Sequence, residues 1–194
     1  MRIVGVSGGL TSPSRTRSLV DFVVKQAVTP LTDAIDLIDV SELSRELLLT
    51  PVRNDTSPKL EAVLKRIETA DLLVIGTPIS NGTYTSLLKR LLDLMSISET
   101  EDKVAIIAAT DSGDCNSLDL EASLRPLLSL LGYCTVSTAV FARDDDFVDL
   151  WVADEAVIVR ARRAVREAFG LLGFKPPLVT LVGSRNSPEA NELG

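Results

Sequence analysis

The sequence of 194 residues contains no histidine. Histidine is the commonest general base and a common metal ligand, so its absence excludes serine–histidine catalytic triads and histidine-based metal sites. The chain has only two cysteines, Cys115 and Cys134, which form no C-x-x-C motif and indicate no disulfide framework. This cysteine usage predicts a protein of the reducing cytoplasm.

Aromatic residues and long apolar runs are also scarce. Phe, Trp and Tyr make up 4% of the chain, so few rings are available to stack on a ligand. No apolar run approaches the roughly 18 residues that a membrane-spanning helix needs, and the N-terminus has a strand pattern rather than that of a signal peptide. Asp and Glu outnumber Lys and Arg by 27 to 20, which gives a net charge of −7. We therefore expect no binding to nucleic acid or to an anionic membrane.

Apolar runs alternate with segments of helical periodicity along the chain. Continuous runs rich in Ile, Val, Leu and Ala are typical of strands buried on both faces of a parallel sheet. The predicted strands are Ile3–Val6, Ile35–Ile38, Leu72–Gly76, Val104–Ala108 and Val136–Phe141. The predicted helices are Thr16–Ala27, Pro58–Glu68, Ser86–Met95, Leu118–Leu131 and Ala153–Leu172.

This alternation of strand and helix predicts a fold of the α/β class. Five repeats indicate a three-layer, doubly wound parallel sheet with right-handed crossovers, whose most natural strand order is the flavodoxin-like 2-1-3-4-5. We expect one domain over residues 1–174 and an extended C-terminal tail over residues 175–194, where Pro, Ser, Asn and Gly are frequent. Two further segments are expected to be irregular, Arg45–Ser57 as a connection and Asp144–Asp146 as a solvated loop.

The segment Ser7–Thr16, directly after the first predicted strand, has the composition of an anion-binding loop. Two glycines lead into a helix, whose first-turn amides and dipole favour a negative charge. Hydroxyl donors come from Ser12, Ser14 and Thr16, and Arg15 adds a cation suited to phosphate. The loop lacks both the Gly-Lys-Ser/Thr ending and the G-x-G-x-x-G spacing, which favours a monophosphate such as that of FMN. A plain polar loop whose serine caps the helix is the alternative.

Two more polar loops follow the third and fourth predicted strands, where a doubly wound sheet binds its ligands. The third strand leads into Pro78, Ile79, Ser80, Asn81, Gly82 and Thr83, and the fourth into Thr110, Asp111, Ser112 and Gly113. Both loops offer backbone amides and carbonyls to a planar, hydrogen-bonding ring, so the three loops together predict a flavin site. Small polar residues are equally common in ordinary short loops, and this alternative stays open.

Several stretches of the chain occur in the order seen in one enzyme family. They are Ser12–Thr16, Gly76–Thr85, Leu87–Asp93, Leu124–Pro126 and Phe141–Phe147. On these stretches, over about residues 1–170, the chain resembles the NADPH-dependent FMN reductases, and particularly those that supply reduced FMN to alkanesulfonate-type monooxygenases. The resemblance implies a flavodoxin-like fold, hydride transfer from NADPH or NADH to FMN, and a monooxygenase partner that receives the reduced flavin.

The chain departs from this family at three places. The family usually has an aromatic residue where this chain has Ser80, paired glycines where it has Asp111–Ser112, and a histidine where it has Asn116. A serine cannot stack on the isoalloxazine ring, and Asp111 would bring negative charge close to the flavin, so weak FMN binding or lost activity is expected. Two alternatives to a reductase therefore stay open. One is a non-catalytic flavodoxin-like binding or regulatory module with a degenerate pocket, and the other is an electron carrier that retains FMN.

The third predicted helix carries more leucine than one buried face requires. Its apolar residues are Leu87, Leu88, Leu91, Leu92 and Met95. This excess predicts a homodimer or homotetramer built around the third and fourth helices. A wide apolar stripe buried inside one subunit is the alternative.

Overall fold

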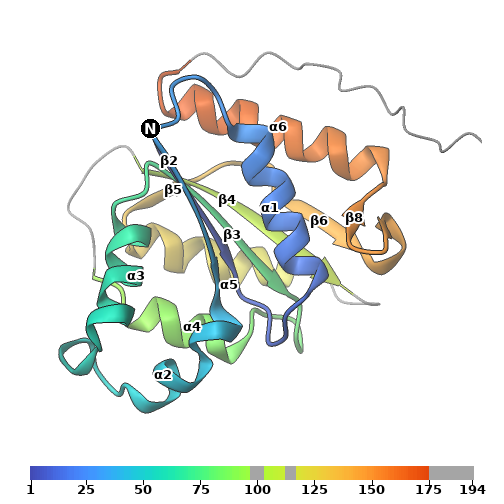
Figure 1. Cartoon of the computed structure of the whole chain (residues 1–194). Coiled ribbons are helices and arrows are strands. Elements are labelled where there is room, and N and C mark those ends of the chain that lie inside the picture. The colour runs from blue at the N-terminus through green and yellow to red at the C-terminus, as the bar shows by residue number, and fades with distance from the viewer. Residues whose placement is uncertain (97–102, 112–116, 175–194) are drawn as a thin grey trace, which may run out of the picture.

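The computed structural model describes residues 1–96, 103–111 and 117–174 (Figure 1). A parallel sheet forms its central layer. The strands of this sheet are β1 (Arg2–Ser7), β2 (Ala34–Asp39), β3 (Leu72–Pro78), β4 (Lys103–Asp111), β5 (Tyr133–Thr135) and β6 (Val140–Arg143). Their order is β2-β1-β3-β4-β5, with β6 also paired to β4, which confirms the predicted flavodoxin-like α/β fold.

Helices cover both faces of the sheet (Figure 1). The helices are α1 (Arg15–Ala27), α2 (Ser44–Leu49), α3 (Pro58–Glu68), α4 (Ser86–Asp93), α5 (Ser117–Leu130) and α6 (Glu155–Leu171). The first and last of these pack on one face, and α3, α4 and α5 pack on the other. Within the described ranges, no helix is both long and apolar enough to cross a membrane.

Short elements complete the fold. They are the 3₁₀ turns η1 (Val40–Leu43), η2 (Arg53–Asp55) and η3 (Asp144–Asp146), and a small antiparallel hairpin of β7 (Phe147–Val148) and β8 (Trp151–Val152). The predicted irregular segments Arg45–Ser57 and Asp144–Asp146 therefore contain regular turns, and α2 occupies the beginning of the first.

Alternate residues of the central strands enter two separate apolar cores, as the continuous apolar runs predicted. In β1, Ile3 lies in the core beneath α1 and α6, whereas Val4 and Val6 lie in the core on the other face. Helix α1 approaches the sheet so closely at Gly76 that an added Cβ would lie 2.2 Å from Cγ2 of Val20. This packing places the N-terminus of α1 at the carboxyl edge of the sheet.

The predicted fifth strand, Val136–Phe141, is wrong in its bounds. The chain instead forms β5 and then β6, which pair with β4 in succession across a short gap. Helix α6 supplies partners for backbone groups in this gap. Glu167 accepts a hydrogen bond of 2.8 Å from the amide of Thr138, and Nε of Arg160 donates one of 2.6 Å to the carbonyl of Ala139. These contacts join residues distant in sequence, so the apolar pattern gave no sign of the break.

The apolar side chains of α4, and Met95 just after it, are buried within one subunit. Leu87, Leu88, Leu91, Leu92 and Met95 are each 8% exposed or less. Helix α2 packs against α4, and its own Leu47 is fully buried. These side chains therefore form a wide internal stripe, which was the alternative, and the oligomer itself stays a prediction.

Some predictions fall outside the described residues. These are the tail over residues 175–194, and the positions of Cys115 and Asn116. The domain boundary at residue 174 stays a prediction.

Candidate functional site

Three loops meet at the carboxyl edge of the sheet, after β1, β3 and β4. Hydrogen bonds hold them together: the amide of Gly8 donates to the carbonyl of Gly76 at 2.7 Å, and the amide of Ile79 donates to that of Thr110 at 2.9 Å. The hydroxyl of Thr85, the N-cap of α4, donates to the carbonyl of Gly8 at 2.7 Å. These bonds fix the three loops relative to one another before any ligand binds.

The start of α1 presents open hydrogen-bond donors. Ser14 is the N-cap, and its hydroxyl oxygen accepts from the amide of Arg17 at 3.2 Å, which leaves the hydroxyl proton free to donate. Within the described part of the chain, the amides of Arg15 and Thr16 have no hydrogen-bond partner. The Thr16 hydroxyl is buried and lies 2.6 Å from that of Thr110, which joins α1 to β4. This helix start is suited to an anion.

The loops line a pocket of about 440 Å³, which we call the phosphate pocket after the ligand that the sequence predicts for it. The predicted site residues in its wall are Ser14, Arg15, Thr16, Pro78, Ile79, Thr110 and Asp111. Those that the structure places outside the wall are Ser12, Ser80, Asn81, Gly82 and Thr83. Ser112 and Gly113 lie outside the described residues.

The segment Ser80–Thr83 is a tight hairpin turn beside the phosphate pocket. The amide of Ser80 donates to the carbonyl of Thr83 at 2.8 Å, and the reverse bond measures 3.1 Å. At the tip, Asn81 and Gly82 have positive φ values of 50° and 79°, which a type I′ turn requires and which these two residue types tolerate. Ser80 is exposed, so it stands at the rim of the site rather than in its wall.

One wall of the phosphate pocket contains residues that the sequence did not predict as site residues. Asp144 of η3 and the hairpin residues Asp149 and Leu150 line the phosphate pocket, together with Thr11 and Pro13. Two sequence signals point to this wall: the segment directly after the last strand of a parallel sheet lies at the same carboxyl edge, and Asp144 lies in the family-like stretch Phe141–Phe147. The composition of Asp144–Asp146 alone predicts a solvated loop, and the structure instead places Asp144 in the pocket wall.

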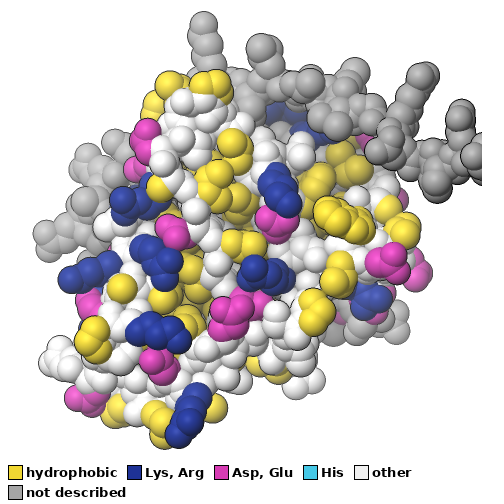
Figure 2. All heavy atoms as spheres, in the orientation of Figure 1, with side chains coloured by type: hydrophobic (Ala, Val, Ile, Leu, Met, Phe, Trp, Pro, Cys, Tyr) yellow, Lys and Arg dark blue, Asp and Glu magenta, His cyan; other side chains and the backbone are white. Residues whose placement is uncertain are grey.

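Arg15 crosses the phosphate pocket to reach this wall. Its Nη1 lies 3.3 Å from Oδ1 of Asp144, and both side chains are about half exposed. Asp111 and Asp149 are also among the residues that line the pocket. An incoming phosphate would therefore compete with Asp144 for Arg15 and meet two further negative charges. Charges of both signs are also mixed over the face of the molecule seen in Figure 2.

A second pocket, of about 370 Å³, adjoins the first. Ile79 and Asp111 line both pockets, and the second extends between β6, η3 and the start of α6. Two arginines, Arg143 and Arg160, are among its lining residues. The carboxyl edge thus offers two connected spaces, as a site for two ligands requires.

Comparisons with known proteins agree along most of the chain. The profile of the family "NADPH-dependent FMN reductase" matches residues 1–147. The FMN reductase (NADPH) of Pseudomonas aeruginosa is 33% identical over 180 residues, which cover 93% of this chain and 97% of the relative. The NADH-dependent FMN reductase SfnF of Pseudomonas fluorescens is 33% identical over 180 residues, with coverages of 92% and 96%.

Two solved oxidoreductase structures superimpose on most of this chain. An oxidoreductase from Corynebacterium diphtheriae superimposes with a TM-score of 0.74 at 31% identity, covering 89% of this chain and 97% of that one. The apo form of the NADH:FMN oxidoreductase EMOB superimposes with a TM-score of 0.75 at 26% identity, covering 91% of each chain.

Proposed function

The chain belongs to the NADPH-dependent FMN reductase family, and from this premise we propose that it catalyses the reduction of FMN by NADPH or NADH and releases the reduced flavin. The observation that carries the proposal is the phosphate pocket, in which the open start of α1 and Arg15 face the loops after β3 and β4. The alternative of a non-catalytic module has no support from the relatives, which are named as reductases.

The donor set of the phosphate pocket fits the monophosphate of FMN. The amides of Arg15 and Thr16, the hydroxyl of Ser14 and the Arg15 guanidinium can all donate to phosphate oxygens. Pro78 and Ile79 add apolar surface next to these donors. We propose that these residues hold the flavin, as the sequence predicted for them.

A bound flavin would supply the hydride-accepting chemistry, and the protein aligns the two substrates and limits access of water. Hydride transfer between two cofactors needs no general acid or base from the protein, so a chain without histidine is suited to it. The acidic wall of the phosphate pocket favours loose binding, which suits a flavin handled as a dissociable substrate. This feature argues against an electron carrier that retains FMN.

We further propose a flavin-dependent monooxygenase as the recipient of reduced FMN, on the basis of the family resemblance. A homodimer or homotetramer also remains our proposal, now on a different surface. Leu48 and Leu49 of α2 are 76% and 72% exposed, and Val52 follows them at 54%. Light scattering at micromolar concentration tests this, since a monomer mass would contradict it. The exposed free thiol of Cys134 supports a reducing cytoplasm as the location.

One experiment tests the proposed function. The purified protein is examined for flavin absorbance, and oxidation of NADH and of NADPH is then followed with and without added FMN. We expect a nearly colourless protein that turns over when FMN is added. A yellow protein without turnover would indicate a carrier, and a colourless protein without turnover would indicate a binding module.

A further inference from the structure

The second pocket differs from the phosphate pocket in its arginines: Arg15 is paired with Asp144, whereas among the described residues neither Arg143 nor Arg160 forms an ion pair. It begins at Ile79 and Asp111, where it joins the phosphate pocket, and reaches the first turn of α6. A dinucleotide that delivers hydride to FMN must enter from a space connected to the flavin. Assigning this pocket to a dinucleotide therefore rests on the proposed function, in which FMN occupies the neighbouring pocket.

Arg160 of α6 presents a held guanidinium to this pocket. Its Nε donates a hydrogen bond of 2.6 Å to the carbonyl of Ala139, and its guanidinium carbon lies 5.9 Å from the ring centroid of Phe141. A cation–π contact with the ring and an anchored Nε restrict how the side chain turns. The two terminal nitrogens have no hydrogen-bond or ion-pair partner among the described residues. They remain available to a ligand.

Two carboxylates in the same pocket have one oxygen engaged and the other open. Oδ2 of Asp146 accepts from the amide of Arg143 at 2.6 Å, and Oδ1 of Asp154 accepts from the amide of Val157 at 3.0 Å. In the part of the chain that the structure describes, the second oxygen of each accepts no hydrogen bond. Carboxylate oxygens accept from hydroxyl groups, whereas a guanidinium donates to phosphate oxygens.

A guanidinium beside two carboxylates matches a ribose joined to a phosphate better than it matches a simple anion. The ribose hydroxyls can donate to the carboxylates, whereas a simple anion would be repelled by them. We propose that the second pocket holds the ribose and pyrophosphate of NADH or NADPH, with Arg160 donating to the pyrophosphate. The nicotinamide would then lie at the junction formed by Ile79 and Asp111. Arg160 thus acts in binding the dinucleotide and not in binding FMN.

The test compares two hydride donors. NADH carries ribose and pyrophosphate, whereas 1-benzyl-1,4-dihydronicotinamide has the same reactive ring and neither of those groups. We expect Arg160→Gln to lower kcat/KM for NADH by about tenfold to a hundredfold, mainly through KM, as for a lost charge-assisted hydrogen bond. The variant should leave kcat/KM for the benzyl compound and the Kd of FMN unchanged.

Arg166→Gln is the matched control, because Arg166 lies on the same helix, is exposed and is outside both pockets. It should leave both donors unaffected. Arg160→Lys keeps a positive charge at this position, and should restore part of the lost activity with NADH. If a thermal melt shows that Arg160→Gln is not folded, Arg160→Lys provides the test by itself. We still expect it to lose activity with NADH and not with the benzyl compound.

Equal loss with both donors, or no loss with either, would overturn the inference. These results differ from failure of the proposed function, in which the unaltered protein would oxidise neither donor in the presence of FMN. Inhibition of the unaltered protein by ADP-ribose gives a second measurement. ADP-ribose should compete with NADH, and its inhibition constant should rise in Arg160→Gln; an unchanged constant would also contradict the proposal.

Discussion

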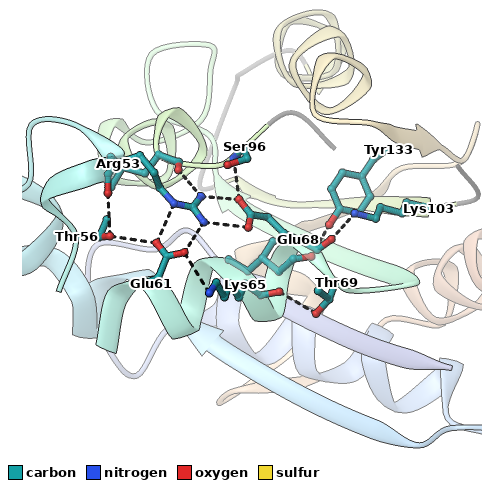
Figure 3. A network of polar contacts seen from close by, with 11 residues as sticks. Arg53, Thr56, Glu61, Lys65, Glu68, Thr69, Ser96, Lys103 and Tyr133 are labelled. Carbon is teal, nitrogen blue, oxygen red and sulfur yellow. Dashed lines mark hydrogen bonds and ion pairs between the residues drawn. The ribbon is translucent and has the colours of Figure 1, made fainter. Parts of the chain in front are cut away.

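Polar groups at the two ends of the sheet differ in whether they have partners within the protein. At the carboxyl end, amides of α1 and the guanidinium of Arg15 are accessible and lie against an open pocket. Toward the other end, polar groups of η2, of α3, of the residues just after α4 and of the first residues of β4 and β5 bind one another (Figure 3). Satisfied groups stabilise the fold, whereas open groups remain free to bind a ligand.

Arg53 is the centre of the satisfied network. Its Nε and Nη2 each donate a 2.9 Å bond to the carboxylate of Glu61. Its Nη1 and Nη2 donate to Glu68 at 2.5 and 3.1 Å, and Nη1 also donates to the carbonyl of Leu94 at 2.7 Å. Hydrogen bonds from Arg53 lower the pKa of Glu61, and those to Glu68 and Glu61 raise the pKa of Arg53 against the opposing effect of burial.

The network continues to the beginnings of two strands (Figure 3). The Tyr133 hydroxyl donates to the carbonyl of Ile67 at 2.5 Å, and Nζ of Lys103 donates to the carbonyl of Glu68. Burial, and then the Glu68 carboxylate, raises the pKa of Tyr133, while burial lowers the pKa of Lys103. Because these bonds tie β4 and β5 to the end of α3, this end of the sheet has a structural role, and changes there should alter stability without altering FMN binding.

The largest effect is expected from Arg53→Met. Removing the guanidinium leaves Glu61 and Glu68 side by side without their shared partner. We expect the free energy of unfolding to fall by about 2 kcal/mol, reduced from the fully buried case because these side chains are partly exposed. Urea denaturation measures the loss, and FMN affinity should be unchanged. Arg66→Met is the control, since Arg66 forms one exposed ion pair, with Asp36, and should change stability by less than about 1 kcal/mol.

Arg53→Met should also change how stability responds to acid. The folded-state pKa of Glu61 is lowered, so its stabilising contribution is present above the pKa of the unfolded chain and is lost as the pH falls through the folded value. Unfolding measured in acid should therefore depend less steeply on pH in Arg53→Met. An unchanged acid profile would show that the network does not carry this dependence.

Arg15→Ala, at the carboxyl end, should lower FMN affinity and leave stability unchanged, the reverse of Arg53→Met. We expect FMN affinity to fall about tenfold, the low end for a charge-assisted contact, because Arg15 is half exposed and already paired with Asp144. Stability should not change. Riboflavin, which has no phosphate, should bind both proteins equally in a fluorescence titration. Arg45→Ala removes an exposed charge elsewhere and is the control; equal losses of FMN affinity in both variants would rule out the phosphate assignment.

Ser80→Tyr tests the rim of the site. An aromatic ring on this turn should stack on isoalloxazine and contribute about 0.5–1.5 kcal/mol, or roughly twofold to tenfold tighter FMN binding. Release of flavin should slow accordingly if it limits turnover. Ser80→Leu adds apolar surface without a ring and separates stacking from burial. Unchanged affinity and absorption spectrum in Ser80→Tyr would show that Ser80 does not face the flavin.

The smallest effect is expected from Asp144→Asn, which frees Arg15 from its competing partner. FMN should bind about twofold to fivefold more tightly, as for removal of one half-exposed charge. Riboflavin binding should stay the same. Asp145→Asn changes the same charge on the same turn, at an exposed side chain outside both pockets. If the two variants tighten FMN binding equally, the effect is one of net charge and not of the Arg15–Asp144 pair.

The sequence by itself determined the architecture and the anion-binding character of the first loop. Residues apolar on both faces of a strand need a layer of helices on each side, so the runs in β1, β3 and β4 imply a three-layer fold. The cap at Ser14 is likewise local, because a hydroxyl reaches an amide three residues away whatever the rest of the chain does. Seven of the predicted site residues accordingly lie in one pocket wall.

Tertiary structure alone decided which groups face each other. The break between β5 and β6 accompanies bonds from α6, the leucines of α4 are buried by α2, and Asp144 opposes Arg15 although 129 residues separate them, from 15 to 144. Periodicity and capping depend on neighbours within one turn or one strand, so they can be predicted from the sequence. Contacts between residues distant in sequence depend on how the layers pack, and a linear pattern does not show which distant residues come together.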